Sequence, residues 1–79
     1  MKKREFIDVA KRMVKEYFKL CWNKKIVLTD ISTIGYRDNS NYLWVLLSVD
    51  DPTSDRYEVV YHKNTGQISS NMYKDICKR

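Results

Sequence analysis

NYLWVLLSVDDPTSDRYEVVYHKNTGQI, residues 41–68, is the stretch that decides the fold of this 79-residue chain. It contains two runs rich in aliphatic, β-branched and aromatic residues, and the turn between them is built around Pro52. A second turn at residues 64–66 leads into Gln67 and Ile68. Apolar and β-branched residues favour strands, whereas Asp, Asn, Pro and Gly favour turns. The stretch is therefore predicted to form the antiparallel centre of a small sheet.

The strand predicted over residues 42–50 is apolar on both faces. Because alternate residues of a strand point to opposite sides, one face of it and its neighbour over 56–63 should present Leu43, Val45, Leu47, Val49, Tyr57, Val59 and Tyr61. The other face should present Tyr42, Trp44, Leu46 and Val60, with Ile26 and Leu28 as further candidates. A single helix covers only one face of a sheet, so the second face needs another cover.

A helix is predicted over residues 3–22, because apolar residues fill one half of the helical wheel and charged residues the other. Asn23 suits the position just after its end. Further strands are predicted over 26–36, with a bulge or bend near 32–35, and over 67–73, where a short helix from Ser70 is the alternative. A basic tail follows at 74–79. The expected fold is a single α+β domain, with the helix packed on one face of a three- to four-stranded antiparallel meander.

The ends of the chain are basic and its middle is acidic. Residues 1–25 carry nine Lys or Arg against three Asp or Glu, and residues 26–62 carry two against six. A signal peptide and a membrane-spanning run are not expected, because charges interrupt the apolar residues after the N-terminus. Cys21 and Cys77 form no metal or redox motif. The sequence predicts a cytoplasmic protein with reduced thiols, and a Cys21–Cys77 disulfide would require both ends of the chain to meet.

Catalytic and metal-binding signatures are not found in the sequence. The spacing of Asp50, Asp51 and Asp55 fits a turn and lacks the glycine and glutamate of a calcium loop. His62 is the only histidine, and no partner for acid–base chemistry is marked beside it. Phosphate-binding loops, zinc-protease motifs and nucleophile triads do not occur. We therefore expect no enzyme, no metal and no cofactor.

The run RYEVVYHKNTGQI, residues 56–68, resembles the closing hairpin of PepSY-type domains, which are small α+β modules often compared with cystatin-like folds. The match is sharp over Tyr57–Ile68, and elsewhere it concerns only the order of elements. The resemblance implies an exported or membrane-linked module that modulates peptidases. No catalytic residue carries over, because the shared motif is a turn.

Two binding surfaces remain as functional candidates. The first is the apolar outer sheet face, Tyr42, Trp44, Leu46 and Val60, which would pair with a second copy or another protein unless Met72, Tyr73 and Ile76 fold over it. The less favoured alternative is a nucleic-acid accessory protein that uses Lys3, Arg4, Lys11, Arg12, Lys15 and Lys19. Glu5, Asp8 and Glu16 share that helix face and would repel phosphates. The sequence therefore favours a non-enzymatic interaction module, most simply a homodimer.

Overall fold

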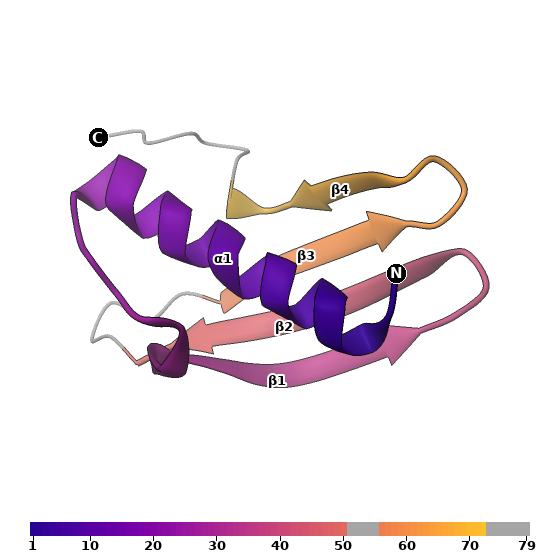
Figure 1. The fold of residues 1–79 in the computed structure, drawn as a ribbon, viewed down its shortest axis with the longest axis horizontal. Helices are drawn as coiled ribbons and strands as arrows, with labels where there is room; N and C mark the ends of the chain where they lie inside the picture. Colours follow the sequence, from indigo (N-terminus) through magenta and orange to yellow (C-terminus); the bar gives the residue numbers. More distant parts are fainter. Residues whose placement is uncertain (51–55, 73–79) are drawn as a thin grey trace.

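The computed structural model describes residues 1–50 and 56–72 of the chain. These contain the helix α1 (Lys3–Trp22), a 3₁₀ turn η1 (Leu28–Asp30) and the strands β1 (Ile31–Asp38), β2 (Tyr42–Val49), β3 (Arg56–His62) and β4 (Gln67–Ser70). The strands pair antiparallel in the order β1-β2-β3-β4, and α1 lies across one face of the sheet (Figure 1). This confirms the predicted α+β fold with one helix on a four-stranded meander.

α1 spans the residues predicted for it. Its buried side chains recur every three or four residues and are Phe6, Ala10, Val14, Phe18 and Cys21. The helix ends where Asn23 adopts a left-handed conformation with φ 48°, and the Asn23 N–H donates to the Phe18 carbonyl. The Lys24 N–H donates to the same carbonyl at 3.1 Å. Backbone donors therefore end this helix, as in other left-handed caps.

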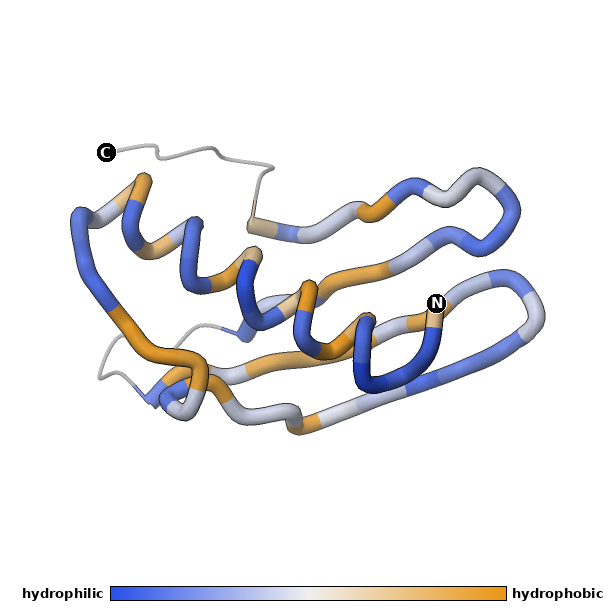
Figure 2. The backbone as a smooth tube through the Cα atoms, in the orientation of Figure 1, coloured by the Kyte–Doolittle hydropathy of each residue, from blue (hydrophilic) through white to orange (hydrophobic). Residues whose placement is uncertain are grey.

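The core lies between α1 and the sheet. β2 alternates strictly along its length, with Leu43, Val45, Leu47 and Val49 buried and the residues between them only partly buried. Tyr57 and Val59 of β3 extend this layer, and Tyr61 packs at its margin. Hydrophobic residues recur along α1 and along β2, whereas the β1–β2 turn and the β3–β4 turn are mainly hydrophilic (Figure 2). The face of the sheet predicted to lie under the helix is thus the one that does.

The start of β1 differs from the prediction of a strand over 26–36. Ile26 is buried in the helix-side core, and Leu28 packs against that core within η1. The Asp30 carboxylate accepts the Val27 N–H at 3.1 Å, and this contact favours a turn over an extended strand. Extended pairing therefore begins only at Ile31. The predicted bulge is present, because the β1–β2 register shifts between Thr33 and Gly35.

The C-terminal strand is shorter than the predicted 67–73. β4 ends at Ser70, whose hydroxyl accepts the Met72 N–H, and the Met72 side chain is buried in the helix-side core. Tyr73, the basic tail at 74–79 and the turn at 51–55 lie outside the described residues. Among the helices that are described, none combines the length and the apolar character needed to cross a bilayer.

Candidate functional site

The outer sheet face is built from the residues of β2 and β3 that point away from α1. The register places Trp44 between Arg37 of β1 and Val60 of β3, and it places Leu46 between Gly35 and Glu58. All four residues predicted for this face, Tyr42, Trp44, Leu46 and Val60, are partly buried there. Ile26 and Leu28, the two further candidates, belong to the helix side instead. The face thus has a small apolar centre with charged residues on both sides.

Trp44 is fixed in place on this face by three contacts. Its indole N–H donates to the Glu58 carboxylate at 2.8 Å, and the Arg37 guanidinium lies 5.6 Å from the ring centroid. The ring also covers Gly35, where a Cβ atom would come within 3.0 Å of the indole Cζ3. An aromatic ring over a strand glycine replaces the packing that the glycine lacks. Trp44 therefore presents an ordered apolar surface.

No described segment of this chain covers the outer face. Met72, the only described member of the predicted C-terminal cover, lies on the opposite side of the sheet with the helix-side core. Tyr73 and Ile76, the other two members, lie outside the described residues. Within residues 1–50 and 56–72, no other segment therefore packs over the side chains at the centre of this face.

The polar groups around the outer face form hydrogen bonds within the sheet. Asn71, which the sequence did not single out, accepts the Glu58 N–H at 3.0 Å and donates to the Arg56 carbonyl at 3.1 Å. His62 Nε2 lies 3.1 Å from the Ser69 hydroxyl. No group of three or more metal-ligating side chains occurs in the part of the chain that the structure describes. The contacts of Asn71 and His62 therefore join β3 to β4 and to the residue that follows β4.

A second set of polar contacts joins Lys63, which follows β3, to the turn between β1 and β2. Lys63 Nζ contacts the Asp38 carboxylate at 2.7 Å and the Asn39 carbonyl at 2.6 Å. Burial, followed by the nearby Asp38 carboxylate, raises the pKa of Tyr36 above its ordinary value of 10.0, and Lys63 opposes this. The Tyr36 phenol therefore stays neutral at physiological pH and does not act as an anionic nucleophile there.

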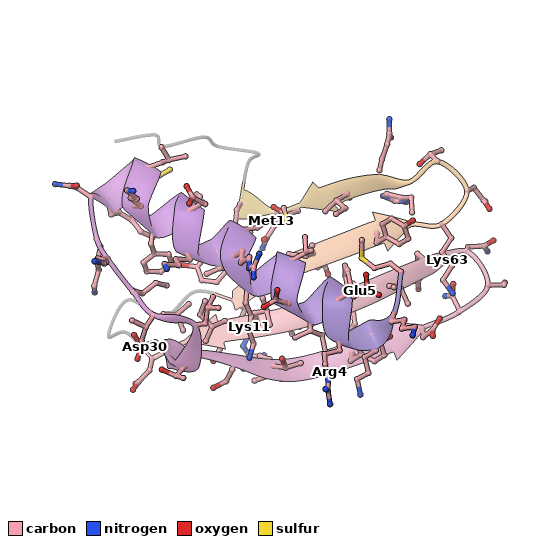
Figure 3. All side chains as sticks on the ribbon, in the orientation of Figure 1. Arg4, Glu5, Lys11, Met13, Asp30 and Lys63 are labelled. Atoms are coloured by element: carbon pink, nitrogen blue, oxygen red, sulfur yellow. The ribbon has the colours of Figure 1, made fainter. Side chains whose placement is uncertain are left out.

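The basic residues predicted to contact nucleic acid fall into two sets. Arg12 pairs with Asp8 at 3.1 Å, and the Lys3 ammonium lies 4.7 Å from the centroid of the Tyr36 ring. Arg4 and Lys11 project from α1 on its β1 side (Figure 3). Lys15 and Lys19 follow Lys11 at four-residue intervals along the helix. The structure thus brings together part of the predicted set and gives Arg12 and Lys3 partners within the chain.

The end of α1 adds two cations that the sequence prediction missed. Lys24 and Lys25 lie in the connector after Asn23 and, with Lys15, Glu16, Lys19 and Ile26, line an open hollow of about 380 Å³. We call Lys11, Lys15, Lys19, Lys24 and Lys25 the lysine flank. Their position after the helix predicts only that they oppose its negative end, and nothing in the sequence indicates that the connector folds back beside the last turns.

Cys21 differs from the predicted reduced thiol. It is 3% exposed and is disulfide-bonded in this structure, and the sequence has one other cysteine, Cys77, outside the described residues. The burial of Cys21 agrees with a structural role. Disulfides persist in oxidising compartments and are rare in the cytosol. The cytoplasmic location expected from the sequence therefore stays a prediction. The disulfide at Cys21 does not favour it.

Comparison of the chain with family models, with curated proteins and with solved structures finds no match. The resemblance to PepSY-type domains therefore rests on residues 57–68 and on the order of the elements. In the structure these residues form β3, the turn at 63–66 and the start of β4.

Proposed function

We propose that this chain is a non-catalytic interaction module that self-associates through the outer sheet face. The observation that carries the proposal is an ordered apolar centre, Trp44, Leu46 and Val60, on the side of the sheet away from the only described helix. Aromatic and aliphatic residues surrounded by polar ones are typical of protein–protein interfaces. The sheet therefore offers a surface suited to pairing.

A second copy is the partner that the charges favour. Arg37 of β1 and Arg56 and Glu58 of β3 flank the apolar centre and carry both signs. In a two-fold dimer each copy presents the same patch, so each positive group can oppose a negative group of the partner. An exclusively acidic or exclusively basic face would disfavour self-association. This face has the mixed charge that self-association needs.

The size of the face limits the strength of the pairing. The strands have eight, eight, seven and four residues and lie about 4.8 Å apart, so the face has an area of roughly 440 Å² per copy. Stable complexes bury about 800 Å² per partner, and weaker encounters bury less. We therefore expect a dissociation constant of about 10 µM or weaker.

Sedimentation equilibrium from 5 µM to 1 mM tests this proposal, with the exchange Leu46→Gln as the probe. Because a two-fold dimer contains the substitution twice, losing about 1 kcal/mol of apolar contact per copy should weaken association by about 30-fold. The matched control is Leu20→Gln, the same exchange at a helix position that is 69% exposed. Leu20→Gln should associate like the unmodified protein.

Two results would contradict self-association through this face. One is a monomer throughout the concentration range. The other is a dimer whose dissociation constant is unchanged by Leu46→Gln or is weakened equally by Leu20→Gln. Circular dichroism checks that both variants keep the fold, so a loss of pairing is not mistaken for unfolding.

A further inference from the structure

The hollow at the end of α1 is strongly positive. Among the described residues that line it, four are lysines and one, Glu16, is an acid. Lys24 has a partner of its own. Lys15, Lys19 and Lys25, set against Glu16 and about half a negative charge from the helix end, leave a net charge of about +1.5. Lys15, Lys19 and Lys25 make no ion pair with any residue within 1–50 and 56–72. The hollow therefore has unneutralised positive charge that an anion can meet.

The lysines of α1 continue this charge as a row. Lys11, Lys15 and Lys19 are spaced by four residues, which is about 6 Å along a helix. Like charges at this spacing destabilise a helix by about 0.2–0.5 kcal/mol per pair. Asp8, three residues before Lys11, is paired with Arg12, and Glu16, which lies between Lys15 and Lys19 in sequence, makes no ion pair with them within the described residues. The row thus lowers the stability of the free protein, and a ligand with regularly spaced negative charges would relieve the repulsion.

Trp22 adds an aromatic surface next to these charges. It is the last residue of α1 and follows Lys15 and Lys19 by seven and three positions, so it shares their side of the helix. Its side chain is 40% exposed, although its ring contacts Tyr17 and Phe18 at centroid distances of 5.1 and 4.9 Å. An exposed ring held by other rings is suited to stacking on an unpaired base.

We propose that the lysine flank and Trp22 bind single-stranded nucleic acid. The lysines contact successive phosphates, and Trp22 stacks on a base. Lysine contacts to phosphates are contacts of a point charge and carry no sequence information, so binding is independent of sequence. A duplex offers the same phosphates but no free base for Trp22, so it should bind more weakly than a single strand.

Fluorescence anisotropy with a labelled 20-nucleotide oligothymidine, from 20 to 200 mM salt, tests the proposal. Contacts from Lys11, Lys15, Lys19 and Lys25 predict a slope of log affinity against log salt of about −2.8 for a single strand. The double variant Lys15→Gln/Lys19→Gln should weaken binding at least tenfold at 50 mM salt and reduce the steepness of the slope by about 1.4. The control Lys2→Gln/Lys63→Gln removes the same charge from positions outside both proposed surfaces and should stay within about threefold of the unmodified protein.

NMR titration of the unmodified protein gives a second measurement that does not depend on the folding of any variant. On adding oligothymidine, the amide signals of residues 15–25 and the indole N–H of Trp22 should shift, while the indole N–H of Trp44 should not. A 20-base-pair duplex should bind at least threefold more weakly, and inorganic phosphate should not compete at millimolar concentration.

Several results overturn the proposal. These are no binding at 20 mM salt, equal losses in the two double variants, equal or tighter binding of the duplex, competition by inorganic phosphate, or shifts at Trp44 in place of Trp22. Apart from shifts at Trp44, which lies on the outer sheet face, none of them bears on self-association, because that proposal concerns the side of the sheet away from α1.

Discussion

At the residue scale, the Trp44 ring packs over Gly35 on the outer sheet face and leaves no room for a side chain there. A Cβ atom at position 35 would lie 3.0 and 3.1 Å from two carbons of the indole, closer than ordinary van der Waals contact. The ring cannot move freely, because its N–H is bonded to Glu58. Gly35→Ala should therefore lower the free energy of unfolding by about 1–3 kcal/mol, the usual cost of overpacking. Urea denaturation measures the change.

The cause of this loss is separable from a general effect of replacing glycine. In Trp44→Leu the smaller side chain leaves room at position 35, so adding Gly35→Ala to that variant should cost much less than it does alone. Gly66→Ala is a useful contrast, because the site has open space but a φ of +73°. It should cost about 1–2 kcal/mol through backbone strain whichever residue occupies position 44. An equal cost for Gly35→Ala with and without Trp44 would contradict steric crowding by the indole.

At the element scale, α1 and β2 were predicted well and β1 was not. The helix has a full-length apolar periodicity, and β2 alternates without interruption, so local sequence and tertiary packing favour the same conformation. Residues 26–30 have a high strand propensity that packing overrides. Ile26 enters the core from a connector, and Asp30 caps the 3₁₀ turn before β1. Propensity does not report such contacts between a connector and a distant core.

The two candidate surfaces were predictable to different extents. Alternation in β2 was sufficient to predict the outer residues Tyr42, Trp44 and Leu46, because side-chain direction in a strand follows from parity. The attachment of Trp44 to Glu58 needed the β2–β3 register, which sequence spacing does not give. The hollow beside Lys24 and Lys25 needed the path of the connector. Periodicity thus predicts faces, and contacts between elements remain beyond it.

A substitution in the lysine row of α1 should change the free energy of unfolding and the affinity for a nucleic acid in opposite directions. Lys15→Glu replaces two like-charge pairs, with Lys11 and Lys19, by two opposite-charge pairs at four-residue spacing. The free energy of unfolding should rise by about 1 kcal/mol at low salt, and the gain should shrink at 1 M salt because exposed charges are screened. Thermal or urea unfolding at both salt concentrations measures this effect.

The same substitution should weaken oligothymidine binding more than Lys15→Gln does, because it adds a negative charge to the hollow. A protein that is more stable but binds more weakly is the outcome expected when a charge is present for a ligand. If Lys15→Glu destabilises the fold at low salt, Lys15 has a partner within the chain and the row does not repel itself.

At the scale of the whole molecule, the two layers separate the proposed functions. α1 lies across one face of the sheet, and the outer sheet face is on the other side (Figure 1). Lys11, Lys15 and Lys19 of the lysine flank belong to α1. A dimer joined through the sheets would place the two helices on its outer surfaces, so both lysine flanks would stay accessible. Sites with no shared partners have additive effects on free energy, usually within about 0.5 kcal/mol. The molecule is therefore expected to lose either function without losing the other.

A double-variant cycle tests this separation. Leu46→Gln should weaken self-association by about 30-fold and change the affinity for a 10-nucleotide strand, which is short enough to engage one flank, by less than twofold. Lys15→Gln/Lys19→Gln should do the reverse, or should strengthen self-association slightly by lowering the repulsion between two positively charged copies. The variant with all three substitutions should show both losses in full. Sedimentation and anisotropy on the four proteins provide the measurements. A loss of strand binding in Leu46→Gln would mean that the strand needs the dimer or contacts the sheet face, and either result would contradict two independent surfaces on opposite layers of one small fold.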